Sequence, residues 1–297
     1  MSDINLNVDE EISASVDVVF SALPQTASAE ALIPMVEKGV KSIDISADFR
    51  LKSASEYEEW YGVPHPKPQL LETAAYGLPE INKSEIKSSS LVANPGCYPT
   101  AALLALAPAV RENIIGEDII IDAKSGVSGA GRSLNLTTHF SEVNENVSAY
   151  AVKGHRHLPE ITQELSRSHN SFTPKITFLP HLIPMTRGIL DSCYATLADN
   201  FIESNDRTIA KVKDIYQDFY KNEPFVKVVD SPPMTKHTLG NNDCIVYPTV
   251  DSRTNRLVVI SCIDNLVKGA AGQAIQNMNL MFDMPENEGL EQLALYP

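Results

Sequence analysis

Apolar residues fall in short runs along the first fifty positions of the chain. The runs at 16–20 and 40–46 predict two short buried strands. Between them, residues 28–38 have the spacing of a helix and are followed by Gly39, a residue that commonly terminates helices. Because strand, helix and strand alternate, we expect a parallel sheet in an α/β fold.

The pattern changes after the strand predicted at 118–123. A long polar loop is expected at 124–146, and amphipathic helices at 209–219 and 266–282. The remaining apolar runs predict further strands at 175–179, 189–197, 244–250 and 256–264. These strands fit a second sheet that is more antiparallel than the first, and a length of 297 residues suggests two domains.

Charge and composition limit the classes of partner. The formal net charge of −14 argues against nucleic acid as the main partner. The sequence has neither an apolar run long enough to span a membrane nor a signal-peptide pattern at its start. The four cysteines are widely spaced, without a CxxC pair, which is typical of a reducing compartment. We therefore expect a cytoplasmic protein.

The most informative segment is Asn-Pro-Gly-Cys-Tyr-Pro-Thr at 94–100. A helix is predicted from Pro99 to about Val110, because Pro99 suits a first helical turn and alanine and leucine follow it. Gly96 permits a sharp turn just before Cys97. Unpaired N–H groups and the helix dipole at this position favour a thiolate, so we expect a lowered pKa and a nucleophilic Cys97. The alternative is a small buried apolar cysteine.

A second cluster, Gly-His-Arg-His at 154–157, precedes Pro159 and Glu160, which open a predicted helix. Histidine carries protons near neutral pH, so His155 and His157 are candidate acid–base groups, with Glu160 as the residue that orients one of them. The alternatives are a polar surface loop, or one functional and one structural histidine. A metal site made with Cys97 is weaker, since no fourth ligand has suitable spacing.

Glycines and arginines supply candidate contacts to an anionic ligand. The small residues that begin at Ser125 would let a ligand approach the backbone, and Arg132 at their end could bind a carboxylate or phosphate. Arg50 follows the end of a predicted strand, where α/β proteins bind ligands. Arg187 is a further candidate. Each of these cations could instead form an ordinary surface ion pair.

Taken together, these motifs resemble those of the N-acetyl-gamma-glutamyl-phosphate reductases, the NADP-dependent enzymes of arginine biosynthesis. The similarity runs in the expected order from about residue 16 to the C-terminus. The matching segments are 46–51, 76–80, 94–100, 125–132, 154–157, 180–188 and 264–274.

The resemblance implies a fold of two parts. A Rossmann-type parallel sheet would form the cofactor domain from residues 1–96, completed by the C-terminal segment 266–297. Residues 97–265 would form an α+β catalytic and dimerisation domain like those of glyceraldehyde-3-phosphate and semialdehyde dehydrogenases. A homo-oligomer is expected, because sheet edges in the second domain would be exposed.

The resemblance also implies site residues. Cys97 would be the nucleophile, and His155, slightly preferred over His157, the acid–base group. Ser21, Leu23, Pro24, Ser125, Gly126, Asn265, Lys268 and Gly269 would line the NADP site. The substrate's anionic groups would be bound by arginines drawn from Arg50, Arg132, Arg156 and Arg187, and no metal is expected.

The implied reaction is reduction of an acyl phosphate to an aldehyde. Cys97 would attack the acyl carbon and expel phosphate, and NADPH would reduce the resulting thioester. A backbone N–H at the helix start could stabilise the oxyanion. Three alternatives remain open: a thiol hydrolase that needs no nicotinamide, a noncatalytic fragment that associates with full-length subunits, and a reductase of aminoadipyl or aspartyl phosphate.

One feature departs from the family pattern. Family members carry a G-x-T-G-x-x-G segment and its helix before the strand matched here at 16–20, and this sequence does not. We therefore expect the nicotinamide end of the cofactor pocket without the pyrophosphate cradle. A misplaced start or a fragment is the preferred explanation over a decayed paralogue, because the catalytic motifs are intact.

Overall fold

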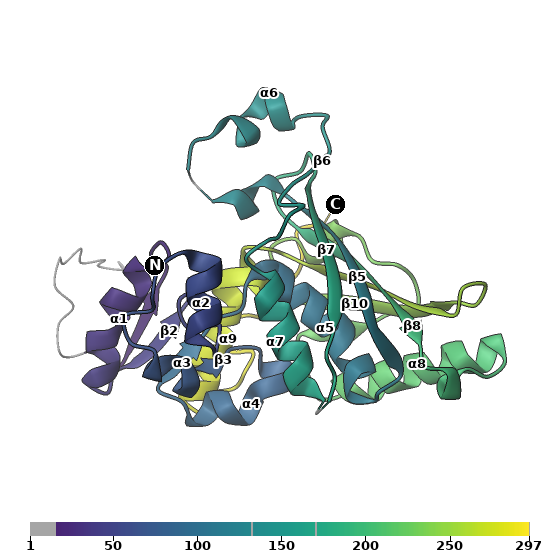
Figure 1. The fold of residues 1–297 in the computed structure, drawn as a ribbon, viewed down its shortest axis with the longest axis horizontal. Helices are drawn as coiled ribbons and strands as arrows, with labels where there is room; N and C mark the ends of the chain where they lie inside the picture. The colour runs from purple at the N-terminus through teal and green to yellow at the C-terminus, as the bar shows by residue number, and fades with distance from the viewer. Residues whose placement is uncertain (1–15, 132, 170, 297) are drawn as a thin grey trace.

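A computed structural model describes residues 16–131, 133–169 and 171–296, which form two sheets with helices packed on them (Figure 1). The expected absence of a glycine loop concerns positions 1–15, outside the described residues. The first sheet has the order β1-β2-β4-β3, and all its pairs are parallel. Its strands are β1 (Val18–Ser21), β2 (Lys41–Asp44), β3 (Ala75–Tyr76) and β4 (Leu91–Ala93). The predicted parallel sheet is confirmed.

Helices cover this sheet, and one of them comes from the far end of the chain. They are α1 (Ala27–Glu37), α2 (Ala54–Tyr61), α3 (Gln69–Thr73), α4 (Pro79–Ser88) and α9 (Gly272–Met281). Ala274 and Met281 of α9 share a buried cluster with Ile43 and Val92 of the sheet. The helix predicted at 266–282 is therefore real, although its first turn, Val267–Ala271, is a π-helix. Figure 1 shows this yellow segment among the purple and blue elements of the first sheet.

The second sheet has seven strands in the order β6-β7-β5-β8-β11-β10-β9. They are β5 (Ile115–Ser125), β6 (Ser148–Ala149), β7 (Lys175–Leu182), β8 (Ile189–Leu197), β9 (Val226–Val228), β10 (Cys244–Asp251) and β11 (Arg256–Ile263). The β5–β7 and β9–β10 pairs are parallel and the other four are antiparallel. The prediction of a more antiparallel second sheet is confirmed.

Helix α5 (Cys97–Arg111) is the centre of the larger core, and α7 (Leu158–Ser168) and α8 (Asn205–Tyr220) pack beside it. All its residues from Tyr98 to Val110 are buried, as expected of a helix that is apolar on every side. Pro108 has no N–H to donate to the carbonyl of Leu104. The Tyr220 hydroxyl donates to that carbonyl instead, at 2.6 Å. A helix containing proline is thereby kept buried without an unpaired carbonyl at this position.

The predicted polar loop at 124–146 begins later than expected, because β5 continues to Ser125. Beyond it lie two 3-10 turns, Val127–Ala130 and Leu136–Thr138, and the short helix α6 (Phe140–Val143). In Figure 1 this segment projects away from the rest of the molecule. Within the described ranges, no helix has both the length and the apolar character needed to cross a membrane.

Candidate active site

Cys97 is the first residue of α5 and follows directly on the turn that leaves β4. Glycines surround it. A Cβ built on Gly269 would lie 2.7 Å from the Cys97 Cβ, so the backbone of the Val267–Ala271 turn packs on the cysteine at a distance that only glycine permits. A Cβ on Gly96 would lie 2.5 Å from Nε2 of His157. The helix start therefore carries the thiol into a junction between the two sheets.

The expectation of a lowered Cys97 pKa is wrong for this conformation. Burial raises the pKa of the thiol to about 11, although the Tyr98 N–H and the charge of Arg50 act in the opposite direction. The loss of hydration of a thiolate thus outweighs the favourable field of the helix start. The residue as a whole keeps some exposed surface. The raised pKa therefore favours the protonated thiol over the thiolate near neutral pH.

Glu160 on α7 anchors the segment that carries Cys97. Its Oε1 accepts the Gly96 N–H at 2.8 Å and the Tyr76 hydroxyl at 2.7 Å, and its Oε2 pairs with Arg50 at 3.3 Å. The hypothesis that Glu160 orients a histidine is therefore corrected. Its three donors saturate a buried carboxylate and fix the turn before the thiol.

Arg50 is buried and each of its three side-chain nitrogens is bonded inside the protein, contrary to its expected role as a substrate contact. Its Nε donates to the Asn94 carbonyl at 2.8 Å, one terminal nitrogen pairs with Glu160, and the other donates to the Ile45 carbonyl at 3.0 Å. The guanidinium charge instead lies near Cys97, where it favours the thiolate. Burial of a cation here required three acceptors, which the sequence pattern did not reveal.

The two histidines lie next to each other, with ring centroids 4.7 Å apart. Edge-to-face contacts with Tyr98, Tyr150 and Phe178 enclose the His155 ring, and its Nδ1 accepts the His157 N–H at 3.1 Å. Nδ1 is thus the acceptor nitrogen, and the neutral ring carries its hydrogen on Nε2.

Both rings are neutral at pH 7. Burial and the charge of Arg156 lower the pKa of His155 to about 4. Burial, His155 and Arg50 lower the pKa of His157 well below its ordinary value. The Nδ1 of His157 is buried without a hydrogen-bond partner among the described residues. A neutral imidazole is therefore present beside Gly96 to take up a proton.

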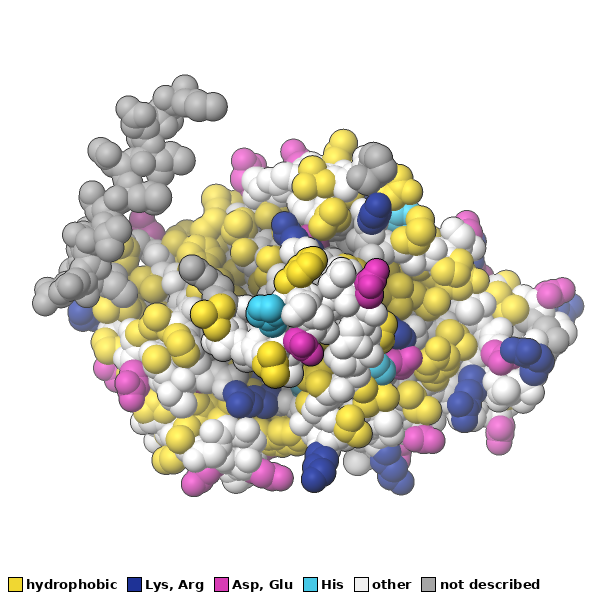
Figure 2. Space-filling view, turned by 90° about the horizontal axis from the view of Figure 1, so that it is seen from above, with side chains coloured by type: hydrophobic (Ala, Val, Ile, Leu, Met, Phe, Trp, Pro, Cys, Tyr) yellow, Lys and Arg dark blue, Asp and Glu magenta, His cyan; other side chains and the backbone are white. Residues whose placement is uncertain are grey.

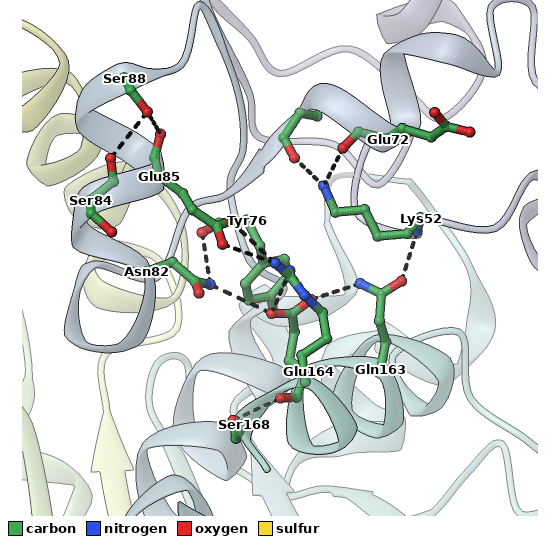
Figure 3. A network of polar contacts seen from close by, with 12 residues as sticks. Lys52, Glu72, Tyr76, Asn82, Ser84, Glu85, Ser88, Gln163, Glu164 and Ser168 are labelled. Carbon is green, nitrogen blue, oxygen red and sulfur yellow. Dashed lines mark hydrogen bonds and ion pairs between the residues drawn. The ribbon is translucent and has the colours of Figure 1, made fainter. Parts of the chain in front are cut away.

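One face of α7 binds the helix to the elements around the first sheet (Figure 3). The Gln163 side chain accepts the Lys52 N–H at 2.7 Å and donates to the Arg50 carbonyl at 3.0 Å. Arg167 pairs with Glu164 on its own helix and with Glu85 on α4, both at 3.1 Å. Positions 160, 163, 164 and 167 share a helical face, so one polar stripe of α7 forms this seam.

Three residues near β1 were expected to bind cofactor, and two of them are exposed to solvent. Leu23 and Pro24 are exposed, whereas the buried Ser21 hydroxyl accepts a hydrogen bond from Ser28 at 2.7 Å. Arg156 is exposed beside this segment, where it bonds to Gln25. Its guanidinium also lies 6.0 Å from the centre of the Tyr61 ring. The segment after β1 therefore meets the histidine loop.

Three other expected cofactor residues lie close together. The Asn265 side chain accepts the Gly188 N–H at 2.7 Å and donates to the Ser128 hydroxyl at 3.0 Å. The Gly126 N–H donates to the Gly188 carbonyl at 2.9 Å, and Ser125 ends β5 just before it. Loops that leave β5, precede β8 and follow β11 thus converge at one end of the second sheet.

Arg187 lies in this cluster of loops and keeps part of its surface exposed. One terminal nitrogen pairs with Asp264 at 2.9 Å. Its Nε is buried and lacks a partner among the described residues. Arg132, the other arginine expected nearby, lies outside the described residues.

Lys268 does not face a cofactor site, and this expectation is corrected. Its side chain is 0% exposed, and Nζ pairs with Glu80 at 2.6 Å and donates to Gln276 at 2.7 Å. Phe225 packs beside the ammonium, 5.5 Å from its ring centre. A buried lysine needs an acidic partner. The partner here is Glu80 of α4, so the ion pair connects the turn before α9 to α4. Gly269 packs on Cys97, as described above.

The sequence interpretation missed several polar groups around the thiol. Tyr76 reaches Glu160, and the Tyr150 hydroxyl donates to that of Tyr98 at 3.1 Å. Asp191 on β8 is 0% exposed, and neither carboxylate oxygen has a partner in the part of the chain that the structure describes. Burial raises the pKa of Asp191 well above its ordinary value. The sequence feature that could have identified Asp191 is an aspartate within an apolar strand pattern.

Among the described residues, no group of three or more His, Cys, Asp or Glu is placed to hold a metal ion. All four cysteines of the chain are free thiols, and the three besides Cys97 are fully buried. The site therefore contains a thiol, two neutral imidazoles, and a carboxylate that fixes the turn before the thiol.

Comparison with protein families matches both parts of the chain. Residues 2–89 match the model described as semialdehyde dehydrogenase, NAD binding domain. Residues 97–265 match semialdehyde dehydrogenase, dimerisation domain. The second match covers more than half of the chain and begins at Cys97.

Curated relatives extend over nearly the whole chain. An N-acetyl-gamma-glutamyl-phosphate reductase of Dehalococcoides mccartyi is 52% identical over 294 residues, which is 99% of this chain and 84% of the relative. The reductase of the same name from Pelotomaculum thermopropionicum is 52% identical, covering 97% of this chain and 82% of the relative. That of Geobacillus kaustophilus is 51% identical over 95% and 80%, respectively.

Solved structures share the fold at low sequence identity. Aspartate semialdehyde dehydrogenase II from Vibrio cholerae has a TM-score of 0.69 at 18% identity, covering 94% of this chain and 83% of that one. Aspartate semialdehyde dehydrogenase with NADP from Candida albicans has a TM-score of 0.64 at 15% identity, covering 90% and 77%. The expected fold class, a parallel cofactor-binding sheet with a semialdehyde-dehydrogenase-like second domain, is confirmed.

Proposed function

The chain belongs to the N-acetyl-gamma-glutamyl-phosphate reductase family, and we propose that it catalyses the NADPH-dependent reduction of N-acetyl-gamma-glutamyl phosphate to N-acetylglutamate semialdehyde. The observation that carries the proposal is the position of Cys97. It is the first residue of a buried helix and keeps some exposed surface, its turn is anchored by Glu160, and the His157 ring lies beside Gly96.

We assign the first step to the Cys97 sulfur. A bond forms between sulfur and the acyl carbon, the bond from that carbon to the phosphate oxygen breaks, and phosphate leaves with the bonding electrons. The thiol proton passes to a neutral imidazole. The raised pKa of Cys97 means that this transfer accompanies attack. The product of the step is a thioester on Cys97.

We assign the proton transfers to the histidine pair. Nε2 of His157 is the nitrogen that lies at Gly96, while His155 is enclosed by aromatic rings and its Nδ1 accepts the His157 N–H. The geometry thus favours His157 as the base over His155, which the sequence comparison slightly preferred. His155 presents an N–H that can donate to the substrate oxygen. Comparing His155→Asn with His157→Asn tests this division, because loss of the base should lower kcat most.

A nicotinamide cofactor fits the exposed segment at Leu23 and Pro24, which follows the carboxyl end of β1, where α/β sheets bind ligands. We assign its binding to this segment together with Ser125, Gly126 and Asn265. NADPH, when bound, supplies the hydride that reduces the thioester. The Gly126 backbone is held in place by its hydrogen bond to the Gly188 carbonyl.

We assign recognition of the substrate's anionic groups to Arg187. The Arg187 side chain is partly exposed and its backbone lies next to Gly126, whereas the Arg50 side chain is buried with all three nitrogens bonded inside the protein. A guanidinium can bind a carboxylate or phosphate through two parallel hydrogen bonds. Arg156 is exposed beside the segment at Leu23 and Pro24, and we assign it to cofactor binding.

Purified protein tests the proposed activity in the reverse direction. NADP should be reduced when N-acetylglutamate semialdehyde and inorganic phosphate are both present, as followed by NADPH absorbance. Cys97→Ser is the matched control. Faster turnover of aspartate or aminoadipate semialdehyde would reassign the substrate. Hydrolysis of acyl compounds without NADP, and no reduction, would favour a thiol hydrolase instead.

We also propose the setting of this activity. Four free cysteines are typical of a reducing compartment, which supports a cytoplasmic enzyme. The match of residues 97–265 to a dimerisation domain supports a homo-oligomer. We infer a functional division into a cofactor domain, residues 1–96 with 266–297, and a catalytic domain, residues 97–265.

A further inference from the structure

Asp191 on β8 is a buried carboxyl group to which the proposed reaction gives no role. On the face of the molecule shown in Figure 2, aspartate and glutamate side chains lie at the solvent surface, as is usual for these residues. Asp191 is instead 0% exposed, and neither of its oxygens has a hydrogen-bond partner among the residues that the structure describes. Glu160, Glu80 and Asp264 are also buried, but each of them pairs with a cation. A buried carboxyl group without such a partner costs stability.

The pairing of the strands places Asp191 beneath the first turn of α5. In the register of the second sheet, Asp191 lies opposite Ser261 of β11 and Ala123 of β5. The Ser261 hydroxyl donates to the carbonyl of Ala101, which is one turn after Cys97 on α5, at 2.9 Å. Directly paired residues of a sheet point to the same face, so Asp191 faces this part of α5 as well.

A second contact places the thiol over the same part of the sheet. Cys97 packs on Gly269, and a Cβ built on Gly269 would also lie 3.2 Å from Cδ1 of Ile263. Ile263 pairs with Ile189, which stands two residues before Asp191 and points to the same face of β8. The thiol and the carboxyl group therefore lie on one face of the sheet, in the same buried region.

The surroundings of Asp191 oppose a negative charge. Burial raises the pKa of Asp191 well above its ordinary value, Lys124 acts against this rise, and Asp122 adds to it. Lys124 and Asp122 flank Ala123 on β5, so they point to the opposite face of the sheet. Burial and, after it, a negative charge on Asp191 raise the pKa of Tyr98, Tyr150, Cys193, Cys244 and Cys262. These five groups are uncharged near neutral pH, so none of them neutralises the carboxylate.

We propose that Asp191 is a positioning residue for Cys97, and that these two buried groups share a single negative charge. When Asp191 is ionised, a thiolate at Cys97 would put two like charges in one buried region, so the sulfur keeps its proton. When Asp191 is protonated, this repulsion is absent and the thiolate forms more readily. Two acids coupled in this way lose their protons in two separate steps that belong to the pair.

The coupling gives the unpartnered carboxyl group a function. An ionised Asp191 keeps the resting Cys97 in the thiol form, which reacts with electrophiles far more slowly than the thiolate does. A negative charge on Asp191 is one of the causes that raise the pKa of Cys97, after burial. In the reductase reaction the thiol proton would then leave only as sulfur attacks the acyl carbon. This last consequence rests on the proposed function, whereas the coupling itself does not.

The test measures the pH profile of the Cys97 thiol in Asp191→Asn, which keeps the shape of the side chain but cannot ionise. Iodoacetamide should alkylate Cys97 about three- to tenfold faster in this variant than in wild type at a fixed pH between about 8 and 9. Mass spectrometry of the peptide that contains Cys97 separates this rate from those of the three buried cysteines. Asp122→Asn is the matched control, because it removes a carboxylate that faces the other side of the sheet, and its rate should stay within about twofold of wild type.

Stability provides a second readout. A carboxyl group whose pKa is raised on folding makes the folded state less stable as pH rises above the pKa of the unfolded chain. Asp191→Asn should therefore gain urea resistance relative to wild type as the pH is raised from about 5 to about 8. Asp191→Ser is the second variant to be measured in the same way. Circular dichroism and the fluorescence of Trp60, the one tryptophan of the chain, report folding.

The outcomes separate the two proposals. Faster alkylation of Cys97 in the folded Asp191 variants, with Asp122→Asn like wild type, supports the coupling whether or not reductase activity is found. Folded Asp191 variants that are alkylated at the wild-type rate or more slowly would overturn the coupling and leave the proposed function untouched. A wild-type protein that reduces no NADP with the semialdehyde and phosphate, but shows the alkylation difference, would overturn the proposed function alone.

Discussion

Two ion pairs among the described residues are almost completely buried, and they are used differently. Arg50–Glu160 and Lys268–Glu80 both join a cation to a carboxylate that is almost completely withdrawn from solvent. In the first pair, Glu160 also accepts the Gly96 N–H and so touches the turn before Cys97. In the second pair, the Lys268 ammonium also donates a hydrogen bond to Gln276 of α9. One pair positions a reactive group, and the other attaches a helix.

The comparison shows that burial of charge does not by itself identify a functional site. Both pairs avoid the large desolvation cost of an isolated charge by close pairing and extra hydrogen bonds. What distinguishes Arg50–Glu160 is its neighbours, the Cys97 thiol and the imidazole of His157. The pairs can therefore be separated by experiments that measure turnover and stability in parallel.

The largest effect is expected at the group that the first pair serves. Cys97→Ser should lower turnover at least about 10⁴-fold, because a serine hydroxyl is a far weaker nucleophile and removal of a nucleophile costs most of the chemical rate enhancement. Urea unfolding should change little. Mass spectrometry of wild type mixed with acyl phosphate, without NADPH, should show an acyl group on Cys97. Its absence from Cys97 would remove the basis for a thioester.

The second-largest effect concerns the pair that attaches α9. Lys268→Met should reduce the free energy of unfolding by about 3–5 kcal/mol, because it leaves the Glu80 carboxylate buried without its cation. Urea denaturation measures this loss. The double variant with Glu80→Leu should recover much of the stability, because both charges are then gone. A single variant as stable as wild type would show that the pair is not a structural clamp.

The third prediction compares the two carboxylates directly. Glu160→Gln should lower kcat about 30- to 100-fold, because the amide no longer neutralises Arg50 and its contact with the Gly96 N–H is weakened. Glu80→Gln is the matched control and should leave kcat within about threefold of wild type at temperatures where it is folded. Equal losses of kcat in the two variants would erase the distinction between a positioning pair and a clamp.

The smallest predicted effect concerns the thiol itself. Since burial raises the pKa of Cys97 to about 11, the thiolate fraction increases about tenfold for each pH unit up to that value. Alkylation of Cys97 by iodoacetamide should therefore accelerate steadily from about pH 7 to about pH 10. A rate that levels off near neutral pH would mean that the helix field and Arg50 overcome burial. Cys97→Ser supplies the background from the three buried cysteines.

Much of the fold could be predicted from local patterns. The strand expected at 189–197 has the bounds of β8, and the helix expected from Pro99 begins only two residues earlier, at Cys97. Strands β3 and β4 escaped prediction because two and three residues are too few to show a period. The grouping of Ser125, Gly126 and Asn265 followed from the family resemblance, because their approach depends on loops distant in sequence.

The sequence by itself determined which residue types stand at the turn before α5, in the histidine motif and in the strands, because turn, cap and periodicity signals act over a few neighbouring residues. Only the tertiary structure decided which charges pair. In the folded protein, Arg50 and Glu160 pair beside the turn before Cys97, and Lys268 is buried against Glu80. Burial also raises the pKa of the Cys97 thiol. Desolvation and ion pairing depend on atoms far apart in the chain, so local patterns do not contain them.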